Sequence, residues 1–183
     1  MQFGPIIVAD KKGRAVVLRN AELTDADALI QFLKETTGET PFLLREAEEV
    51  DAITPAQEEQ FVQSRIVAER ELMLAAVVEG ALAGICSLCS VGPFQRYRHR
   101  CAVSIALYQK FCGAGIGEIM LRTILNEAKQ LGYEQAELDV IADNAAAIAL
   151  YEKLGFEKCG YFPSNVKYRD GRYADAYWMM KRL

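Results

Sequence analysis

The stretch Cys112-Gly113-Ala114-Gly115-Ile116-Gly117 places three glycines at alternate positions between two hydrophobic segments. The segment before it, Cys101 to Leu107, is apolar and predicts a strand, and the segment after it, Ile116 to Leu131, has helical periodicity. The loop therefore leads into a helix start, where backbone N–H groups lack intrahelical partners and the macrodipole is positive. Because glycine allows a ligand to approach the backbone closely, the pattern favours an anion site, with the pyrophosphate of a nucleotide-like cofactor as the expected ligand. A tight turn without a ligand is the alternative.

The composition is that of an ordinary globular domain. The chain has 183 residues, of which 51% are hydrophobic and 25% are charged, so we expect a single domain over residues 1–183. The net charge of −4 argues against a nucleic-acid partner, and no apolar run has the length of a membrane span. Met1 to Lys12 lacks a basic start followed by an apolar core, so no signal peptide is expected.

The five cysteines are an odd number without the spacing of a disulfide framework, which suits a reducing compartment and predicts a cytoplasmic protein. Cys86 and Cys89 form a CxxC pair, but they lie within a predicted strand, where residues three apart point to opposite faces. The chain has a single histidine, His99, and no second cysteine pair. Core thiols are therefore favoured over metal or redox chemistry, and no metal site is expected.

Hydrophobic periodicity and turn residues predict strands and helices on both sides of the glycine loop. The predicted strands are Arg14 to Asn20, Leu72 to Val78, Leu82 to Val91, Cys101 to Leu107, Glu137 to Ile141, Glu157 to Pro163 and Tyr173 to Met180. Two of the predicted helices begin at the N-caps Thr24 and Thr54. Two more run over Ile116 to Leu131 and Asn144 to Leu154. This order predicts an α/β or α+β fold, a mixed sheet with helices on both faces.

Two charged segments show no clear period. Thr37 to Thr54 contains acidic residues that could line a site for a cationic acceptor: Glu39, Glu46, Glu48, Glu49 and Asp51. Phe94 to Arg100 contains basic residues that could contact cofactor phosphates: Arg96, Arg98, His99 and Arg100. A solvated charged surface is the alternative in both cases.

A second motif, Asn144-Ala-Ala-Ala-Ile-Ala-Leu-Tyr-Glu-Lys-Leu-Gly-Phe156, follows the glycine loop. Together the two resemble the motifs of the GNAT superfamily of acetyl-CoA-dependent N-acetyltransferases, Arg/Gln-x-x-Gly-x-Gly/Ala and Asn-x-x-Ala-x-x-Leu-Tyr-x-x-x-Gly-Phe. The resemblance extends from about Arg14 to Leu183, with some likeness to the ribosomal-protein alanine N-acetyltransferases. It implies the GNAT acyltransferase fold, in which the mixed sheet is mostly antiparallel. The departure is Cys112, which stands where the family has Arg or Gln.

The resemblance implies acetyl-CoA as the acetyl donor. The strand residues expected to pair with the pantetheine arm are Ile105, Ala106 and Leu107. The loop residues expected at the pyrophosphate, through their backbone, are Cys112, Gly113, Ala114, Gly115 and Gly117. Asn144 is expected to contact the cofactor, to cap its own helix, or both. Without a long side chain at position 112, binding rests on the backbone donors.

The resemblance also implies direct attack of a neutral primary amine on the thioester, with no covalent enzyme intermediate. Tyr151 is the candidate general acid for the departing thiolate, with a core tyrosine as the alternative. Many relatives place a glutamate where this chain has Ala102, so Asp139 is the candidate base, acting through a water; a surface or second-shell carboxylate is the alternative. In the ribosomal-protein alanine N-acetyltransferases, which this chain resembles, a glutamate with a similar spacing looks like the base. Cys112 is not favoured as a nucleophile because no histidine stands beside it.

The acceptor amine, a small molecule or a protein N-terminus, is not identified by any motif. The closing strand could supply a sheet edge for a homodimer. A non-catalytic acyl-CoA-binding or sensor module is the alternative function. A Rossmann-type nucleotide-binding domain predicts Gly-x-Gly-x-x-Gly, but Met120 occupies the position of the third glycine.

Overall fold

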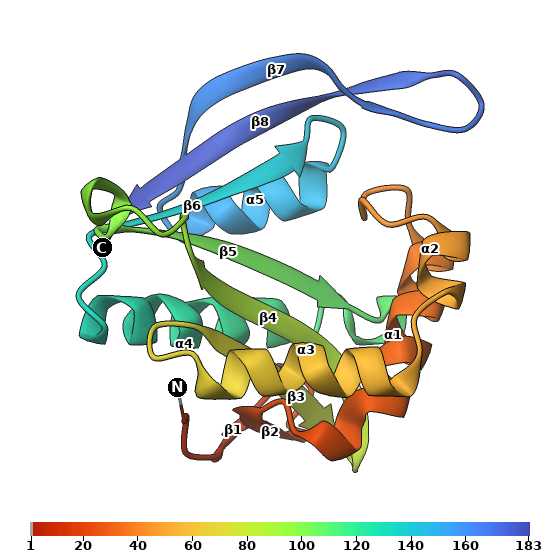
Figure 1. Ribbon diagram of the computed structural model, residues 1–183, viewed down its shortest axis with the longest axis vertical. Helices are drawn as coiled ribbons and strands as arrows, with labels where there is room; N and C mark the ends of the chain where they lie inside the picture. Colours follow the sequence, from red (N-terminus) through yellow and green to blue (C-terminus); the bar gives the residue numbers. More distant parts are fainter. Residues whose placement is uncertain (1) are drawn as a thin grey trace. The chain divides into compact units, whose positions relative to one another are not determined.

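The computed structural model describes residues 2–183 (Figure 1). The chain divides into two compact units, of which unit 1 contains residues 2–89 and 104–124 and unit 2 contains residues 90–103 and 125–183. The strand β5 (Arg100–Leu107) begins in unit 2 and ends in unit 1. The glycine loop therefore lies in unit 1, and the second motif lies in unit 2.

Unit 1 contains neighbouring antiparallel strands in the order β1-β2-β3-β4. These strands are β1 (Ile6–Ala9), β2 (Ala15–Asn20), β3 (Leu72–Val78) and β4 (Ala81–Ser90). The helices are α1 (Ala26–Glu39), α2 (Ala47–Asp51), α3 (Pro55–Val67) and the first part of α4 (Ile116–Gln130). β3 lies between two strands and its apolar side chains are almost all buried, as a continuous hydrophobic run predicts.

Unit 2 has the strand order β5-β6-β8-β7. β5 runs parallel to β6 (Gln135–Ile141), and β8 (Tyr173–Arg182) is antiparallel to both β6 and β7 (Glu157–Lys167). α5 (Ala145–Lys153) follows β6. The mixed α/β fold predicted from the sequence is confirmed.

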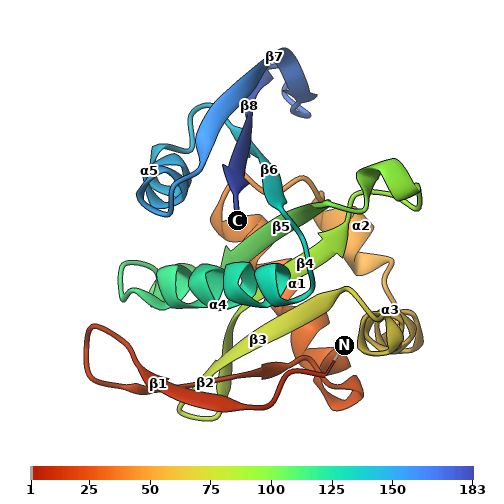
Figure 2. The ribbon, with the colours of Figure 1, turned by 90° about the vertical axis from the view of Figure 1, so that its left-hand side faces the viewer.

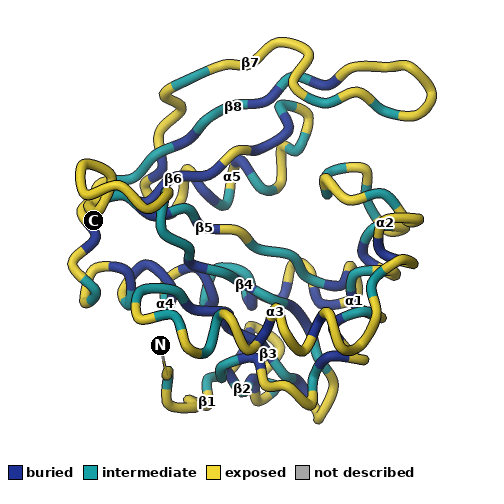
Figure 3. The backbone as a smooth tube through the Cα atoms, in the orientation of Figure 1, coloured by how far each residue is buried: buried dark blue, intermediate teal, exposed yellow. Residues whose placement is uncertain are grey.

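One prediction about the edge of the sheet is wrong. The closing strand β8 is paired on both sides, by β6 and by β7, so it offers no edge to a second copy. The edge strand of unit 2 is β7, whose residues are mostly exposed (Figure 3).

The predicted strand and helix ends hold where local capping decides them. Thr54 caps α3, because its hydroxyl accepts a hydrogen bond from the Gln57 N–H at 3.3 Å. In return, the Gln57 side-chain oxygen accepts a hydrogen bond from the Thr54 N–H at 2.9 Å. The turn between β3 and β4 has positive φ at Glu79 (53°) and at Gly80 (81°), as a two-residue hairpin turn requires. Asn144 caps α5 by accepting from the Ala147 N–H at 3.2 Å.

Thr24 is not an N-cap, which corrects the prediction for the first helix. It lies inside a 3-10 turn, Leu23–Asp25, whose capping box is formed by Glu22 and Asp25. Arg19 holds the Asp25 carboxylate with two hydrogen bonds of 2.6 and 2.8 Å, and the same carboxylate accepts the Glu22 N–H at 2.8 Å, so the 3-10 turn forms ahead of the helix. α1 consequently begins at Ala26.

Other differences arise in short or weakly patterned segments. β1 has four residues with mostly exposed side chains, so it lacks the alternation that identifies a strand. α2 begins with a capping box of Glu46 and Glu49 inside the acidic segment. α3 ends at Val67, before the predicted end near Arg70. Within residues 2–183, no helix is long and apolar enough to cross a membrane.

Candidate functional site

The glycine loop joins a 3-10 turn, Gln109–Phe111, to α4 in unit 1. Gly113 and Gly115 have φ angles of 76° and 85°, a backbone conformation that favours glycine. Between them Ala114 is buried, and its carbonyl accepts a hydrogen bond of 2.9 Å from the Lys11 N–H. The N–H groups in the first turn of a helix have no partner inside the helix, so the start of α4 after this loop presents donors that suit an anion.

The strand end before the loop is fixed by a close approach of β4 and β5. A Cβ on Gly84 would lie 2.6 Å from the Ala106 carbonyl oxygen and 2.8 Å from Leu107 Cγ, so only glycine leaves room for this contact. The Tyr108 N–H donates to the Ala83 carbonyl at 3.1 Å. The predicted pantetheine segment, Ile105 to Leu107, is half-buried and leads directly into the loop.

The thiol of Cys112 is in a poor environment for nucleophilic chemistry. It donates to the Tyr108 carbonyl at 3.6 Å. Partial burial and the negative charge of Glu39 both raise the pKa of the Cys112 thiol above its ordinary value. Glu39 is held at this place because its carboxylate accepts the Gln109 N–H at 2.8 Å. The thiolate form is therefore disfavoured, in agreement with the sequence prediction.

In unit 2, Asp139 lies on β6, opposite Trp178 of β8. Glu137 points to the same face of the strand, because side chains two residues apart share a face. Partial burial and the negative charge of Glu137 both raise the pKa of the Asp139 carboxyl above its ordinary value. Such a shift brings a carboxylate closer to the range in which it can accept a proton near neutral pH.

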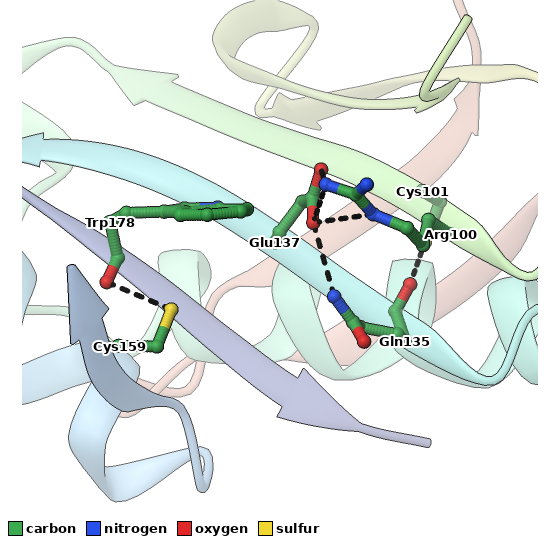
Figure 4. A network of polar contacts seen from close by, with 6 residues as sticks. All are labelled: Arg100, Cys101, Gln135, Glu137, Cys159 and Trp178. Atoms are coloured by element: carbon green, nitrogen blue, oxygen red, sulfur yellow. Dashed lines mark hydrogen bonds and ion pairs between the residues drawn. The ribbon is translucent and has the colours of Figure 1, made fainter. Parts of the chain in front are cut away.

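Glu137 was not identified by the sequence patterns. It is buried and stands opposite Ala102, the position at which the family resemblance predicts a glutamate. Its carboxylate binds Arg100 Nη2 through both oxygens at 2.8 Å and Arg100 Nε at 3.1 Å (Figure 4). One indication was available in the sequence, namely a charged residue inside an apolar strand. Such a carboxylate is expected to be buried, and a buried carboxylate needs a paired cation.

Arg100 is also covered by aromatic rings. Its guanidinium carbon lies 4.8 Å from the centre of the Tyr97 ring and 5.7 Å from that of the Trp178 ring. The basic segment Phe94 to Arg100 thus contributes one cation to an internal ion pair rather than to a phosphate. Arg96, Arg98 and His99 are exposed.

Tyr151 is buried near the end of α5, and its ring packs against Phe156 at a centroid distance of 5.8 Å. Asn144, at the other end of the helix, uses its side chain as the cap. The predicted catalytic residues, Tyr151 and Asp139, are thus both in unit 2 together with Asn144, whereas the predicted pyrophosphate and pantetheine residues are in unit 1.

The acidic segment Thr37 to Thr54 gives no support to a cationic acceptor. Glu46 and Glu49 form the capping box of α2, and Asp51 pairs with Lys34 at 2.9 Å. These carboxylates stabilise local structure, which accords with the alternative of a solvated charged surface.

The cysteines behave as core and surface thiols. Cys86 is buried, whereas Cys89 is partly exposed and lies 3.4 Å from Arg65 Nη1, so the two thiols face different surroundings, as predicted. Burial raises the pKa of both thiols. Among the residues that the structure describes, no group of three or more His, Cys, Asp or Glu side chains gathers in a way that could hold a metal ion.

A comparison with protein families matches residues 30–156 to the acetyltransferase (GNAT) family. This range covers more than half of the chain and includes both the glycine loop and the second motif.

Two curated relatives are similar over almost the whole chain. An L-methionine sulfoximine/L-methionine sulfone acetyltransferase from Pseudomonas paraeruginosa is 24% identical over 91% of this chain and 94% of its own length. An N-alpha-acetyltransferase from Sulfurisphaera tokodaii is 28% identical over 94% of this chain and 96% of its own length.

Solved structures share the fold. A GNAT-family acetyltransferase from Streptococcus pneumoniae is 27% identical, with a TM-score of 0.86 over 92% of this chain and 99% of that chain. An acetyltransferase from Salmonella typhimurium, solved with its cofactor acetyl-CoA, is 21% identical, with a TM-score of 0.80 over 92% of this chain and 94% of that chain.

Proposed function

The chain belongs to the acetyltransferase (GNAT) family and transfers acetyl groups from acetyl-CoA to amines, and we propose that its acceptor is the α-amine of a free amino acid or a close analogue. The observation that carries the proposal is the similarity to an L-methionine sulfoximine/L-methionine sulfone acetyltransferase over 91% of this chain. Carboxylates of the acidic segment, which was predicted to line a site for a cationic acceptor, form a helix cap and an ion pair.

For the donor, we place the pyrophosphate at the backbone of Cys112 to Gly117 and the pantetheine arm beside Ile105 to Leu107. The positive φ angles at Gly113 and Gly115 support this, because they form the turn that leads into the helix start. Asn144 caps α5 in the structure, and contact with the cofactor is a second role that we propose for it.

For the chemistry, Asp139 accepts a proton through a water from the ammonium group of the acceptor, which leaves the neutral amine free to attack the thioester, and Tyr151 donates its phenolic proton to the departing thiolate. The raised pKa of Asp139 supports the first role. The neighbouring carboxylate, Glu137, is neutralised by Arg100 and is therefore a weaker candidate. A phenol O–H is a competent donor, and no covalent enzyme intermediate is needed because the amine attacks the thioester directly.

A protein N-terminus is the second candidate acceptor, because the N-alpha-acetyltransferase relative covers 94% of this chain. Both candidates present an α-amine. They differ at the neighbouring carbonyl, which is a charged carboxylate in a free amino acid and a neutral amide in a peptide. We also expect the protein to act in the cytoplasm, where five free thiols are compatible with the reducing conditions.

The experiment is an acceptor panel with release of CoA thiol as the readout. It contains L-methionine sulfoximine and several L-amino acids, the amide of each, and short peptides with the same first residue. We expect kcat/KM for the free acids to exceed that for the matched amides and peptides by about tenfold or more, since a lost charge-assisted contact costs this much. Turnover of peptides alone would assign the second candidate. Binding of acetyl-CoA without turnover of any amine would support the non-catalytic alternative.

A further inference from the structure

The turn between β1 and β2 is held rigid by one buried carboxylate. Asp10 accepts hydrogen bonds from the N–H groups of Lys12 (2.8 Å) and Arg14 (2.9 Å) and from Arg14 Nε (2.8 Å). The Asp10 side chain is fully buried beneath the turn. The conformation of residues 10–14 is therefore fixed by local contacts rather than by the side chains of Lys11 or Lys12.

This turn is attached to the glycine loop. The Lys11 N–H donates to the Ala114 carbonyl at 2.9 Å, and the Arg14 guanidinium carbon lies 5.4 Å from the centre of the Phe111 ring. The β1–β2 hairpin and the start of α4 both belong to unit 1, and Figure 2 shows the turn of the hairpin near the start of α4. A segment about a hundred residues away in the sequence is thus part of the surroundings of the loop.

The side chain of Lys11 extends across Gly115. A Cβ on Gly115 would lie 3.0 Å from Lys11 Cγ, 3.3 Å from Cδ and 3.2 Å from Cε. The aliphatic stem therefore covers the α-carbon of the glycine, and the ammonium group is one bond beyond. Lys11 is exposed, and within residues 2–183 no carboxylate is paired with its ammonium.

The glycine loop itself contains no cationic side chain. From Phe111 to Gly117 no side chain is charged, and Cys112 replaces the Arg or Gln of the family motif. The nearby Lys110 is directed at two aromatic rings, with Nζ 4.8 Å from the Tyr108 ring centre and 5.5 Å from that of Phe111. The free ammonium that is placed against the loop is that of Lys11.

We propose that Lys11 binds the pyrophosphate of acetyl-CoA and supplies, from the β1–β2 turn, the cationic contact that an arginine at position 112 would provide. This inference rests on the proposed function, in which the glycine loop holds the pyrophosphate. A lysine stem that covers a glycine can bring its charge to an anion at the adjacent helix start without any other side chain from the loop. The loop then supplies backbone N–H donors, and the β1–β2 hairpin supplies the positive charge of Lys11.

The test compares Lys11→Gln with the matched control Lys12→Gln by titration with CoA in calorimetry. Both variants remove one exposed lysine from the same turn, and neither touches the backbone bond to Ala114 or the Asp10 contacts. We expect Lys11→Gln to weaken CoA binding about fivefold, the scale of a solvent-accessible charge contact. Lys12→Gln should stay within about twofold of the parent protein.

Three further arms examine the nature of the contact. The loss in Lys11→Gln should shrink in high salt, because an exposed charge contact is screened. It should be equal for CoA and for dephospho-CoA, since both contain the pyrophosphate. Lys11→Gln combined with Cys112→Arg should regain affinity, because the cation returns at the family position.

The outcomes separate this inference from the proposed function. If the parent protein binds CoA and Lys11→Gln binds it equally well, Lys11 has no role at the phosphate, and the loop assignment stands. A loss seen with CoA but absent with dephospho-CoA would overturn the pyrophosphate assignment, since the contact would then be to the 3′-phosphate. If the parent protein binds no CoA at all, the proposed function fails first.

Discussion

The glycine loop and strand β6 represent two ways of building a site. The loop offers backbone N–H groups at a helix start, shaped by positive φ at Gly113 and Gly115, and no side chain from Phe111 to Gly117 is charged. β6 offers carboxylates, Glu137 and Asp139, whose properties depend on neighbouring side chains. A backbone site tolerates an unusual residue such as Cys112, whereas a site made of side chains does not.

If backbone groups of the loop hold the cofactor and side chains on α5 and β6 carry out the chemistry, changes on α5 and β6 should alter turnover. Changes that alter the loop backbone should alter cofactor affinity. The variants below test whether the two effects separate.

Tyr151→Phe should have the largest effect. Without a phenolic proton the thiolate leaves unprotonated, so we expect kcat to fall about a hundredfold, within the usual range for a lost general acid. CoA affinity should be nearly unchanged, as measured by calorimetry. A large loss of affinity with normal turnover would show instead that Tyr151 binds the cofactor.

Gly115→Val should weaken CoA binding by about thirtyfold or more, because a β-branched residue at a φ of 85° is strained and would also displace the Lys11 stem. Gly80→Val is the control, since Gly80 has a similar φ of 81° with nothing within 4 Å of an added Cβ. Circular dichroism would confirm that both variants fold. Equal CoA affinity in the two variants would count against the loop as the pyrophosphate site.

Asp139→Asn should lower kcat about tenfold, a modest loss because a water intervenes. The base must be ionised, so activity rises with pH through the pKa of Asp139, which lies above its ordinary value of 3.8. The pH–rate profile of the variant should lose this acidic limb and retain only the limb caused by deprotonation of the acceptor amine. An unchanged pH–rate profile would remove Asp139 from the mechanism.

Glu137→Gln should have the smallest effect on turnover. The negative charge of Glu137 contributes to the raised pKa of Asp139, so its removal lowers that pKa and moves the acidic limb to lower pH. The variant also leaves Arg100 without its partner, which should lower the free energy of unfolding by about 2 kcal/mol for this largely buried pair. Denaturant unfolding measures the second effect, and a limb that stays in place would contradict the electrostatic coupling.

The sequence predicted those features that depend on neighbours within a few residues. The range of β3, the Thr54 cap, the Glu79-Gly80 turn and the Asn144 cap all follow from local propensity and local hydrogen bonds. The glycine loop and the helix start after it were predicted in the same way, because both depend on local backbone conformation and on backbone N–H groups.

The features that were missed depend on residues far apart in the chain. The Arg100–Glu137 pair joins two strands, and the contact of Lys11 with the loop joins residues 11 and 114. Thr24 is an exception, because Arg19 and Asp25 are only six residues apart, but their ion pair is not part of a local capping pattern that the sequence shows. Pairings of this kind require the fold before they can be identified.

The most direct test of the central claim is a competition for acetyl groups. The protein receives acetyl-CoA with an equimolar mixture of L-methionine sulfoximine and a peptide whose N-terminal residue is methionine, and mass spectrometry identifies the acetylated product. The account predicts acetyl groups predominantly on the α-amine of the free amino acid. Acetylation of the peptide alone, or no acetylated product although acetyl-CoA binds, would contradict it.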